Sequence, residues 1–168
     1  MPDSEPKIFI VSWDQFHRDC KTLAKKLIKE GKQWKGLIAV TRGGTFPAGA
    51  LAREMEILVI ETVGISSYDD QKQGELKVIK DFNHALVGDG EGWIVVDDLV
   101  DTGNTIKAIR NMLPKAYIAT IYAKPAGEAL VHKYASPISQ DTWIYFPWDV
   151  DIQPIDPLIR KLQQGGAT

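Results

Sequence analysis

Short apolar segments alternate with amphipathic segments along most of this 168-residue chain. Patterns typical of strands cover residues 36–40, 58–68, 93–96, 116–125 and 142–146. Patterns typical of helices cover residues 12–30, a segment that begins at Pro47, residues 104–113 and residues 157–164. Because a helix between two strands carries the chain back across the sheet, this alternation favours parallel pairing. The sequence therefore predicts an α/β fold with a mostly parallel sheet flanked by helices.

The length predicts a single domain over residues 1–168. The net charge is −2 with acidic and basic residues interspersed, so no basic stripe is available and we expect no nucleic-acid partner. Cys20 is the only cysteine, which excludes a disulfide framework and is typical of a reducing compartment. No secretory signal and no apolar run of about 18 to 20 residues is visible. We expect a cytoplasmic protein; peripheral contact with the inner membrane face is left open.

The most informative segment is "DDLVDTGNT", residues 97–105, which follows the apolar strand pattern. The adjacent carboxylates of Asp97 and Asp98 repel each other and therefore need a partner. A glycine between two threonines then begins a helix, where backbone N–H groups and the helix dipole favour an anion such as phosphate. The acids can accept hydrogen bonds from vicinal hydroxyls or hold a hard divalent cation. Together these features predict a sugar phosphate and Mg²⁺ as ligands.

Other phosphate-binding patterns are absent from the sequence. There is no GxxxxGK[ST] loop and no GxGxxG fingerprint. A phosphatase that forms an aspartyl phosphate would carry alternating acids, whereas Asp97 and Asp98 are adjacent. Two other strand patterns end in polar turns, at Arg42-Gly43-Gly44 and at Lys124-Pro125. Because ligands bind beyond the carboxyl ends of parallel strands, we expect these turns to converge on one edge of the sheet.

The segment "IVVDDLVDTGNT" resembles the phosphoribosyl-pyrophosphate motif of type I phosphoribosyltransferases. Six further segments follow the order and spacing of the bacterial purine branch that acts on xanthine and guanine: "WKGLIAVTRGG", "GISSYDD", "ELKVIK", "GDGEG", "YAKPAG" and "QDTWIYFPWD". This resemblance covers nearly the whole chain. It implies the type I fold with a small hood and a mobile active-site loop. It also implies transfer of 5-phosphoribosyl from phosphoribosyl pyrophosphate to N9 of xanthine, guanine and, less well, hypoxanthine, giving XMP, GMP and IMP in purine salvage.

The resemblance also implies roles for individual residues. Phosphoribosyl pyrophosphate would contact Arg42, Gly43, Asp97, Asp98, Leu99, Val100, Asp101, Thr102, Gly103, Asn104 and Thr105. Asp98 would contact Mg²⁺, and Asp101 would lie beside purine N7 and exchange its proton as the catalytic group. The base would also contact Lys124, Trp143 and Ile144. An ammonium has only donors, so Lys124 would favour a 6-oxo group over the amino group of adenine.

Residues 66–80 resemble the mobile loop, with Ser66, Ser67, Tyr68, Gly74 and Lys77 as its contributors. The chain departs from the family pattern at Gly74, where relatives carry arginine, at Asn104, where glycine is common, and in an apparent insertion, Phe82–Val87. His84 in that insertion is predicted to be a surface residue. The family is generally oligomeric, which implies a homo-oligomer, by resemblance a tetramer.

Other interpretations remain open at this point. Plain structural roles also fit three residues: a helix N-cap for Asp101, a solvated side chain for Lys124, and a core position for Trp143. A regulator that binds phosphoribosyl pyrophosphate without turnover is a second hypothesis, but it would need a nucleic-acid-binding surface. A transferase for another base is a third.

Overall fold

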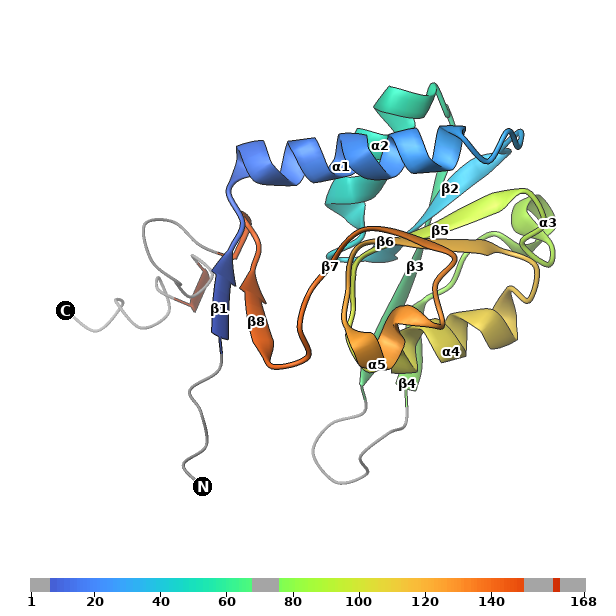
Figure 1. Ribbon diagram of the computed structural model, residues 1–168. Helices are drawn as coiled ribbons and strands as arrows, with labels where there is room; N and C mark the ends of the chain where they lie inside the picture. Colours follow the sequence, from blue (N-terminus) through green and yellow to red (C-terminus); the bar gives the residue numbers. More distant parts are fainter. Residues whose placement is uncertain (1–6, 68–75, 150–158, 161–168) are drawn as a thin grey trace. The chain divides into compact units, whose positions relative to one another are not determined.

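The computed structural model of the chain describes residues 7–67, 76–149 and 159–160 (Figure 1). Its elements follow the order β1 (Lys7–Ile10), α1 (Trp13–Ile28), β2 (Gly36–Thr41), α2 (Thr45–Met55), β3 (Ile60–Ser67), β4 (Leu76–Lys80), α3 (His84–Val87), β5 (Trp93–Val100), α4 (Asn104–Met112), β6 (Tyr117–Ala123), α5 (Pro125–Glu128), β7 (Lys133–Pro137) and β8 (Thr142–Tyr145). Contacts within the chain divide it into a larger unit, residues 18–140, and a smaller unit, residues 1–17 with 141–168. The single domain expected from the length stays a prediction.

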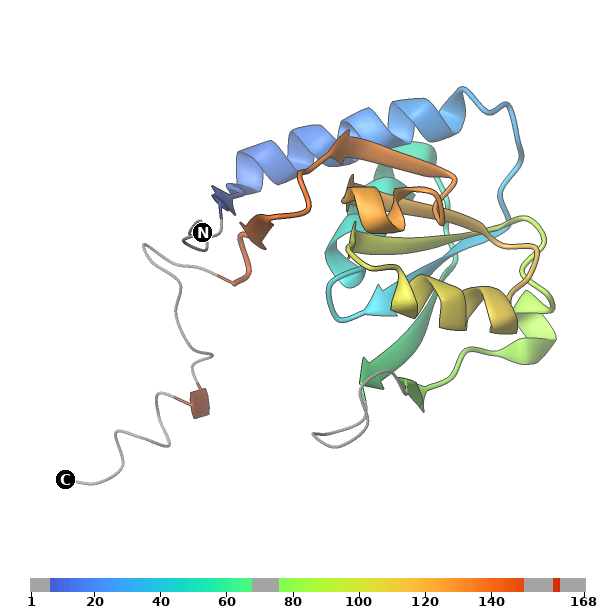
Figure 2. The same cartoon turned by 60° about the horizontal axis from the view of Figure 1, so that its bottom comes forward.

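The larger unit contains a six-stranded sheet in the order β4-β3-β2-β5-β6-β7. All neighbouring strands are parallel except β3 and β4, which are antiparallel. Figures 1 and 2 show α1 and α2 over one face of this sheet and α4 over the other. The predicted α/β fold with a mostly parallel sheet between helices is confirmed.

The helices cover the sheet with the apolar stripes that the sequence predicted. Ser12 caps α1, because its Oγ accepts the Gln15 N–H at 3.1 Å. Apolar residues of α1 at three- and four-residue spacing are buried: Phe16, Cys20, Leu23, Ala24 and Leu27. On the α4 side, Ile106 and Ile109 join one apolar core with Trp93 and Val95 of β5. The central strands are almost wholly apolar because helices cover both of their faces.

Five elements were not predicted: β1, β4, α3, α5 and β7. In the larger sheet, β4 and β7 are the two edge strands, and each has only five residues. Short edge strands with charged side chains are common because they discourage pairing with other chains, and such strands lack the apolar pattern of a buried strand. The helix α2 also begins at Thr45 rather than at Pro47, since the first turn of a helix does not use its N–H groups and tolerates proline there.

The connections around β2 and β5 run in opposite directions. From β2 the chain passes through α2 to β3 on one side, and from β5 it passes through α4 to β6 on the other. Because β2 and β5 are neighbours and parallel, the turns that follow them separate at the carboxyl edge of the sheet. Such a switch point is where open α/β sheets bind ligands. The Arg42–Gly44 turn and residues 97–105 lie there.

The smaller unit is built on a parallel pair of strands, β1 and β8. Trp148 packs edge-to-face on Phe16, with ring centroids 5.2 Å apart, and stacks on Phe146 at 4.7 Å. The small additional unit that the resemblance implies is therefore present. Its parallel pairing unites segments from opposite ends of the sequence, Lys7–Ile10 and Thr142–Tyr145.

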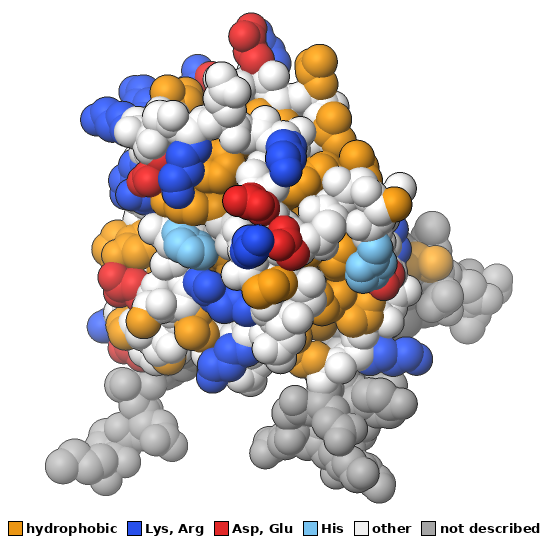
Figure 3. Space-filling model, turned by 90° about the vertical axis from the view of Figure 1, so that its right-hand side faces the viewer, with side chains coloured by type: hydrophobic (Ala, Val, Ile, Leu, Met, Phe, Trp, Pro, Cys, Tyr) orange, Lys and Arg blue, Asp and Glu red, His pale blue; other side chains and the backbone are white. Residues whose placement is uncertain are grey.

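The surface agrees with the interspersed charges of the sequence. On the face shown in Figure 3, lysine and arginine side chains lie among aspartate and glutamate side chains without a continuous patch of one sign. Within the described ranges, no helix is both long enough and apolar enough to cross a membrane.

Candidate active site

The acidic residues lie on β5 itself. The sequence predicted that this strand ends at Val96, but it continues to Val100, because Asp97 and Leu99 still pair with β6. At its end the Lys124 N–H donates to the Val100 carbonyl at 2.9 Å. The apolar pattern stops after Val96 because the next two side chains are acidic. Strand pairing uses backbone hydrogen bonds, so the strand can continue past that point. The strand therefore holds the acid pair rigidly at the switch point.

Asp97 and Asp98 are half-buried at this position. The Asp98 N–H donates to Asp97 Oδ1 at 2.9 Å. Burial, and then the neighbouring charge of Asp98, raise the pKa of the Asp97 carboxyl well above its usual range. A cation or a pair of hydroxyl donors at this point would offset both effects.

The chemistry of the acid pair fits Mg²⁺. Among the residues that the structure describes, no cluster of three or more His, Cys, Asp or Glu side chains could hold a metal ion. Mg²⁺ at Asp97 and Asp98 would therefore share two carboxylates with oxygens of a phosphate-bearing ligand and with water, which is a common arrangement for this ion.

The Arg42–Gly44 turn packs directly against β5. A Cβ on Gly43 would overlap the Asp98 carboxylate, and a Cβ on Gly44 would overlap the carbonyl oxygen of Val96. The Arg42 side chain is exposed, and the peptide bond before Arg42 is cis. The two glycines therefore bring the backbone of this turn into contact with the acid pair, which a side chain at either position would prevent.

The turn before α4 forms an anion-binding geometry. Gly103 adopts a left-handed conformation with φ of 84°, which favours glycine. The first hydrogen bond of α4 runs from the Lys107 N–H to the Gly103 carbonyl at 2.9 Å. The N–H groups of residues 104–106 therefore have no acceptor inside the helix and are available to a ligand.

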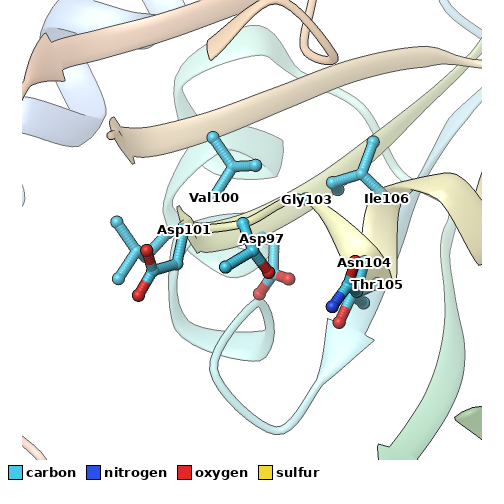
Figure 4. Close-up of a pocket in the computed structure, with 9 residues that line it drawn as sticks. Asp97, Val100, Asp101, Gly103, Asn104, Thr105 and Ile106 are labelled. Carbon is cyan, nitrogen blue, oxygen red and sulfur yellow. The ribbon is translucent and has the colours of Figure 1, made fainter. Parts of the chain in front are cut away.

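A cavity of about 130 Å³ lies at this turn. Its lining residues are Asp97, Leu99, Val100, Asp101, Thr102, Gly103, Asn104, Thr105 and Ile106. Figure 4 shows Val100 and Ile106 on one side of the turn and the side chains of Asn104 and Thr105 on the other. The structure thus brings together most of the residues predicted to bind phosphoribosyl pyrophosphate.

Asp101 and Lys124 form an ion pair across the ends of β5 and β6. Lys124 Nζ donates to Asp101 Oδ2 at 3.0 Å. The lysine side chain is only 7% exposed, whereas that of Asp101 is 49% exposed. Lys124 is therefore not a solvated side chain, and Asp101 is not the N-cap of α4, which is Gly103.

Sequence reasoning missed Gln140. Its Nε2 donates to Asp101 Oδ1 at 2.7 Å, and its Oε1 accepts the Ala126 N–H at 2.9 Å. Gln140 belongs to the segment "QDTWIYFPWD", but no spacing or motif distinguishes it from any other loop glutamine.

The other predicted base contacts, Trp143 and Ile144, lie on β8 in the smaller unit. Trp143 is 59% exposed, which contradicts a plain core role, and Ile144 is buried. Their contact with a base stays a prediction.

The predicted mobile loop is described only at its two ends. Ser66 of β3 pairs with Lys77 of β4, and Ser67 pairs with Leu76. Tyr68 and Gly74 lie outside the described residues.

The apparent insertion Phe82–Val87 contains α3 and contributes two core side chains. Phe82 and Val87 are each 4% exposed. His84 has a side chain 64% exposed and pairs with Asp81, as its predicted surface position requires.

Comparisons with known proteins agree with this geometry. Residues 10–155 match the family described as phosphoribosyl transferase domain. The chain is 49% identical over 165 residues to xanthine-guanine phosphoribosyltransferase of Desulfotalea psychrophila, covering 98% of this chain and all of that relative. It is 49% identical to the enzyme of the same name from Nitratidesulfovibrio vulgaris, covering 96% of this chain and 97% of that one. The crystal structure of a purine phosphoribosyltransferase from Pyrococcus horikoshii matches with a TM-score of 0.71 at 24% identity, covering 89% of this chain and 99% of that chain.

Proposed function

We propose that this chain, which belongs to the phosphoribosyltransferase family, transfers 5-phosphoribosyl from phosphoribosyl pyrophosphate to N9 of xanthine, guanine and, less well, hypoxanthine. The products are XMP, GMP and IMP together with pyrophosphate, and the pathway is purine salvage. Two relatives at 49% identity, both named as xanthine-guanine phosphoribosyltransferases, support this choice of bases.

The observation that carries the proposal is the pair formed by Asp101 and Lys124. A carboxylate acceptor and an ammonium donor lie 3.0 Å apart beside the acid pair and the anion-binding turn. In an oxo-purine the N7 proton and the 6-oxo oxygen are neighbours on one edge of the base. Asp101 can accept the first while Lys124 donates to the second. Adenine has an amino group in place of the oxo group and offers Lys124 no comparable acceptor.

The remaining groups fit the sugar and its phosphates. The first turn of α4 takes the 5′-phosphate, because its free N–H groups and the helix dipole favour an anion. Asp97 and Asp98 accept hydrogen bonds from the two ribose hydroxyls, and Asp98 would also hold Mg²⁺. The backbone of Arg42 and Gly43 borders the departing pyrophosphate.

The reaction exchanges one bond for another at C1 of the ribose. The N9 lone pair attacks C1 as the bond from C1 to the pyrophosphate oxygen breaks, and pyrophosphate leaves with that electron pair. The N7 proton passes to Asp101, which balances the charge on the base. The carboxylates of Asp97 and Asp98 stabilise the positive charge that develops on the ribose. Mg²⁺, when bound, supplies charge neutralisation of the pyrophosphate.

Three finer features belong to the same proposal. Activity requires Mg²⁺, because the acid pair is itself negative and repels a polyanionic leaving group, whose charge a divalent cation would neutralise. The enzyme is a homotetramer, as the resemblance to its family implies, and it works in the cytoplasm, including at the inner membrane face, as the single cysteine and the lack of a secretory signal led us to expect. The site needs no nucleic-acid partner.

The proposal is tested by pyrophosphate release from phosphoribosyl pyrophosphate and Mg²⁺, with xanthine, guanine, hypoxanthine and adenine offered separately. Release with the first three and not with adenine is expected. Tight binding of phosphoribosyl pyrophosphate without release on any base would identify a ligand sensor instead. Release with adenine alone would identify a transferase for another base.

A further inference from the structure

We propose that Gln140 is a positioning residue for Asp101, holding its carboxylate in the plane that receives the purine N7 proton. The inference rests on the proposed function, which gives Asp101 that proton. Gln140 lies in the loop between β7 and β8 and contacts Asp101 Oδ1 at 2.7 Å. Lys124 contacts the other oxygen, Oδ2, at 3.0 Å. Each oxygen of the carboxylate thus has its own donor.

The orientation of the Gln140 amide follows from its two partners. Its Oε1 accepts the Ala126 N–H at 2.9 Å, so its Nε2 faces Asp101. The reversed amide would place an oxygen against the carboxylate and an NH₂ group against an N–H. Both contacts would be repulsive, so only the observed orientation satisfies both neighbours.

Asp101 needs a second donor because burial does not fix its side chain. Its side chain is 49% exposed, and it lies just beyond the end of β5. One ammonium at one oxygen leaves the carboxylate free to rotate about its last torsion, which is broad for aspartate. A second donor at the other oxygen fixes the carboxylate plane. Each oxygen keeps a further lone pair, so the N7 proton still has an acceptor.

Gln140 also ties Asp101 to the turn that carries Lys124. Ala126, which donates to Gln140, lies in α5, the short helix that follows Lys124. The last residue of α5, Glu128, accepts a hydrogen bond at Oε1 from Tyr134 Oη at 2.5 Å. The spacing between the acceptor for N7 and the donor for the 6-oxo group is therefore set by this network. A misplacement of about 1 Å can cost about 100-fold in rate when reacting groups must align.

Two substitutions separate the contacts of Gln140. Gln140→Ala removes both. Gln140→Glu keeps an acceptor for the Ala126 N–H but places a second oxygen against Asp101. If Gln140 acts through Asp101, both variants lower kcat about tenfold or more, because a hydrogen bond to a charged group is lost, while KM for phosphoribosyl pyrophosphate stays unchanged. If Gln140 only supports the turn, Gln140→Glu behaves as wild type and the proposal is overturned.

Gln33→Ala is the matched control. Gln33 is exposed between α1 and β2, at the amino end of that strand, so its truncation should leave kcat unchanged. Melting temperatures of all variants are measured, and rates are compared well below them. A kcat loss in Gln33→Ala equal to that in Gln140→Ala would overturn the assignment.

The final experiment places Gln140→Ala in an Asp101→Ala background. A tenfold effect in wild type that shrinks to less than about twofold without Asp101 supports the proposal, since contacting residues are not additive. An undiminished effect without Asp101 overturns it while leaving the proposed function intact. If Asp101→Ala keeps the wild-type kcat, Asp101 has no catalytic role, and the positioning role proposed for Gln140 is refuted as well.

Discussion

The substitution Gly43→Ala tests the contact between the Arg42–Gly44 turn and the acid pair. The new Cβ would lie 2.6 Å from Asp98 Cγ and 2.9 Å from its Oδ1, whereas ordinary contacts begin at 3.4 Å. Because Asp98 Oδ2 would be closer still, either the turn or the Asp98 carboxylate must move by more than about 0.8 Å, the difference between 3.4 Å and 2.6 Å. Both the turn and the Asp98 carboxylate belong to the proposed binding site for ribose, metal and pyrophosphate.

The size of the effect follows from that displacement. A shift of about 1 Å in a positioning group can lower the rate about 100-fold, so we expect kcat/KM for phosphoribosyl pyrophosphate to fall by roughly that factor. Overpacking costs about 1 to 3 kcal/mol of unfolding free energy, which lowers the melting temperature without preventing folding.

Steady-state pyrophosphate release at varied phosphoribosyl pyrophosphate and Mg²⁺ measures the effect, with melting temperatures as the check on folding. Gly49→Ala is the matched control, because a Cβ at Gly49 in α2 meets nothing within 4 Å. That control should keep wild-type kinetics and gain about 0.5 to 1 kcal/mol of stability. Wild-type kcat/KM in Gly43→Ala would refute the close approach between this turn and Asp98.

Three further predictions address the base site and the core. Asp101→Asn should lower kcat about 100-fold while leaving the Kd of phosphoribosyl pyrophosphate unchanged, because only proton transfer is lost; an unaltered kcat in single-turnover assays removes the proposed role. Lys124→Ala should reduce the preference for guanine over adenine about 10- to 100-fold in kcat/KM, and an unchanged preference would assign base selectivity elsewhere. Burial, then the charges of Asp19 and Glu54, raise the pKa of the Cys20 thiol from 9.0 to about 12. The unfolded thiol therefore loses its proton between these values while the folded thiol keeps it, so the unfolding free energy should fall by up to about 1.4 kcal/mol per pH unit as pH rises. Urea titrations from pH 9 to 10 should show a steeper fall in wild type than in Cys20→Ala, because the raised pKa values of Tyr117, Tyr122 and Tyr134 contribute a slope of the same sign to both proteins.

The sequence predicted the larger sheet well where the strands are central. The runs that became β2, β5 and β6 are apolar because helices cover both of their faces, and that burial is recorded in residue types. The edge strands β4 and β7 escaped prediction because exposed edges carry mixed side chains, and their pairing depends on the neighbouring strand. β1 was missed although Ile8, Phe9 and Ile10 are typical strand residues, because four residues are a short signal and its partner, β8, lies more than a hundred residues along the chain.

By itself, the sequence determined the residue types of the site and their order, from the acid pair through the glycine turn to Lys124. Local chemistry suffices for these predictions, because a helix start, a glycine turn or two adjacent acids have the same properties wherever they occur. Only the tertiary structure decided that Gly43 touches Asp98, that Lys124 is buried against Asp101, and that Gln140 donates to the same carboxylate. Those contacts join residues from separate loops. Their distances are set by strand order and packing, which no local pattern contains.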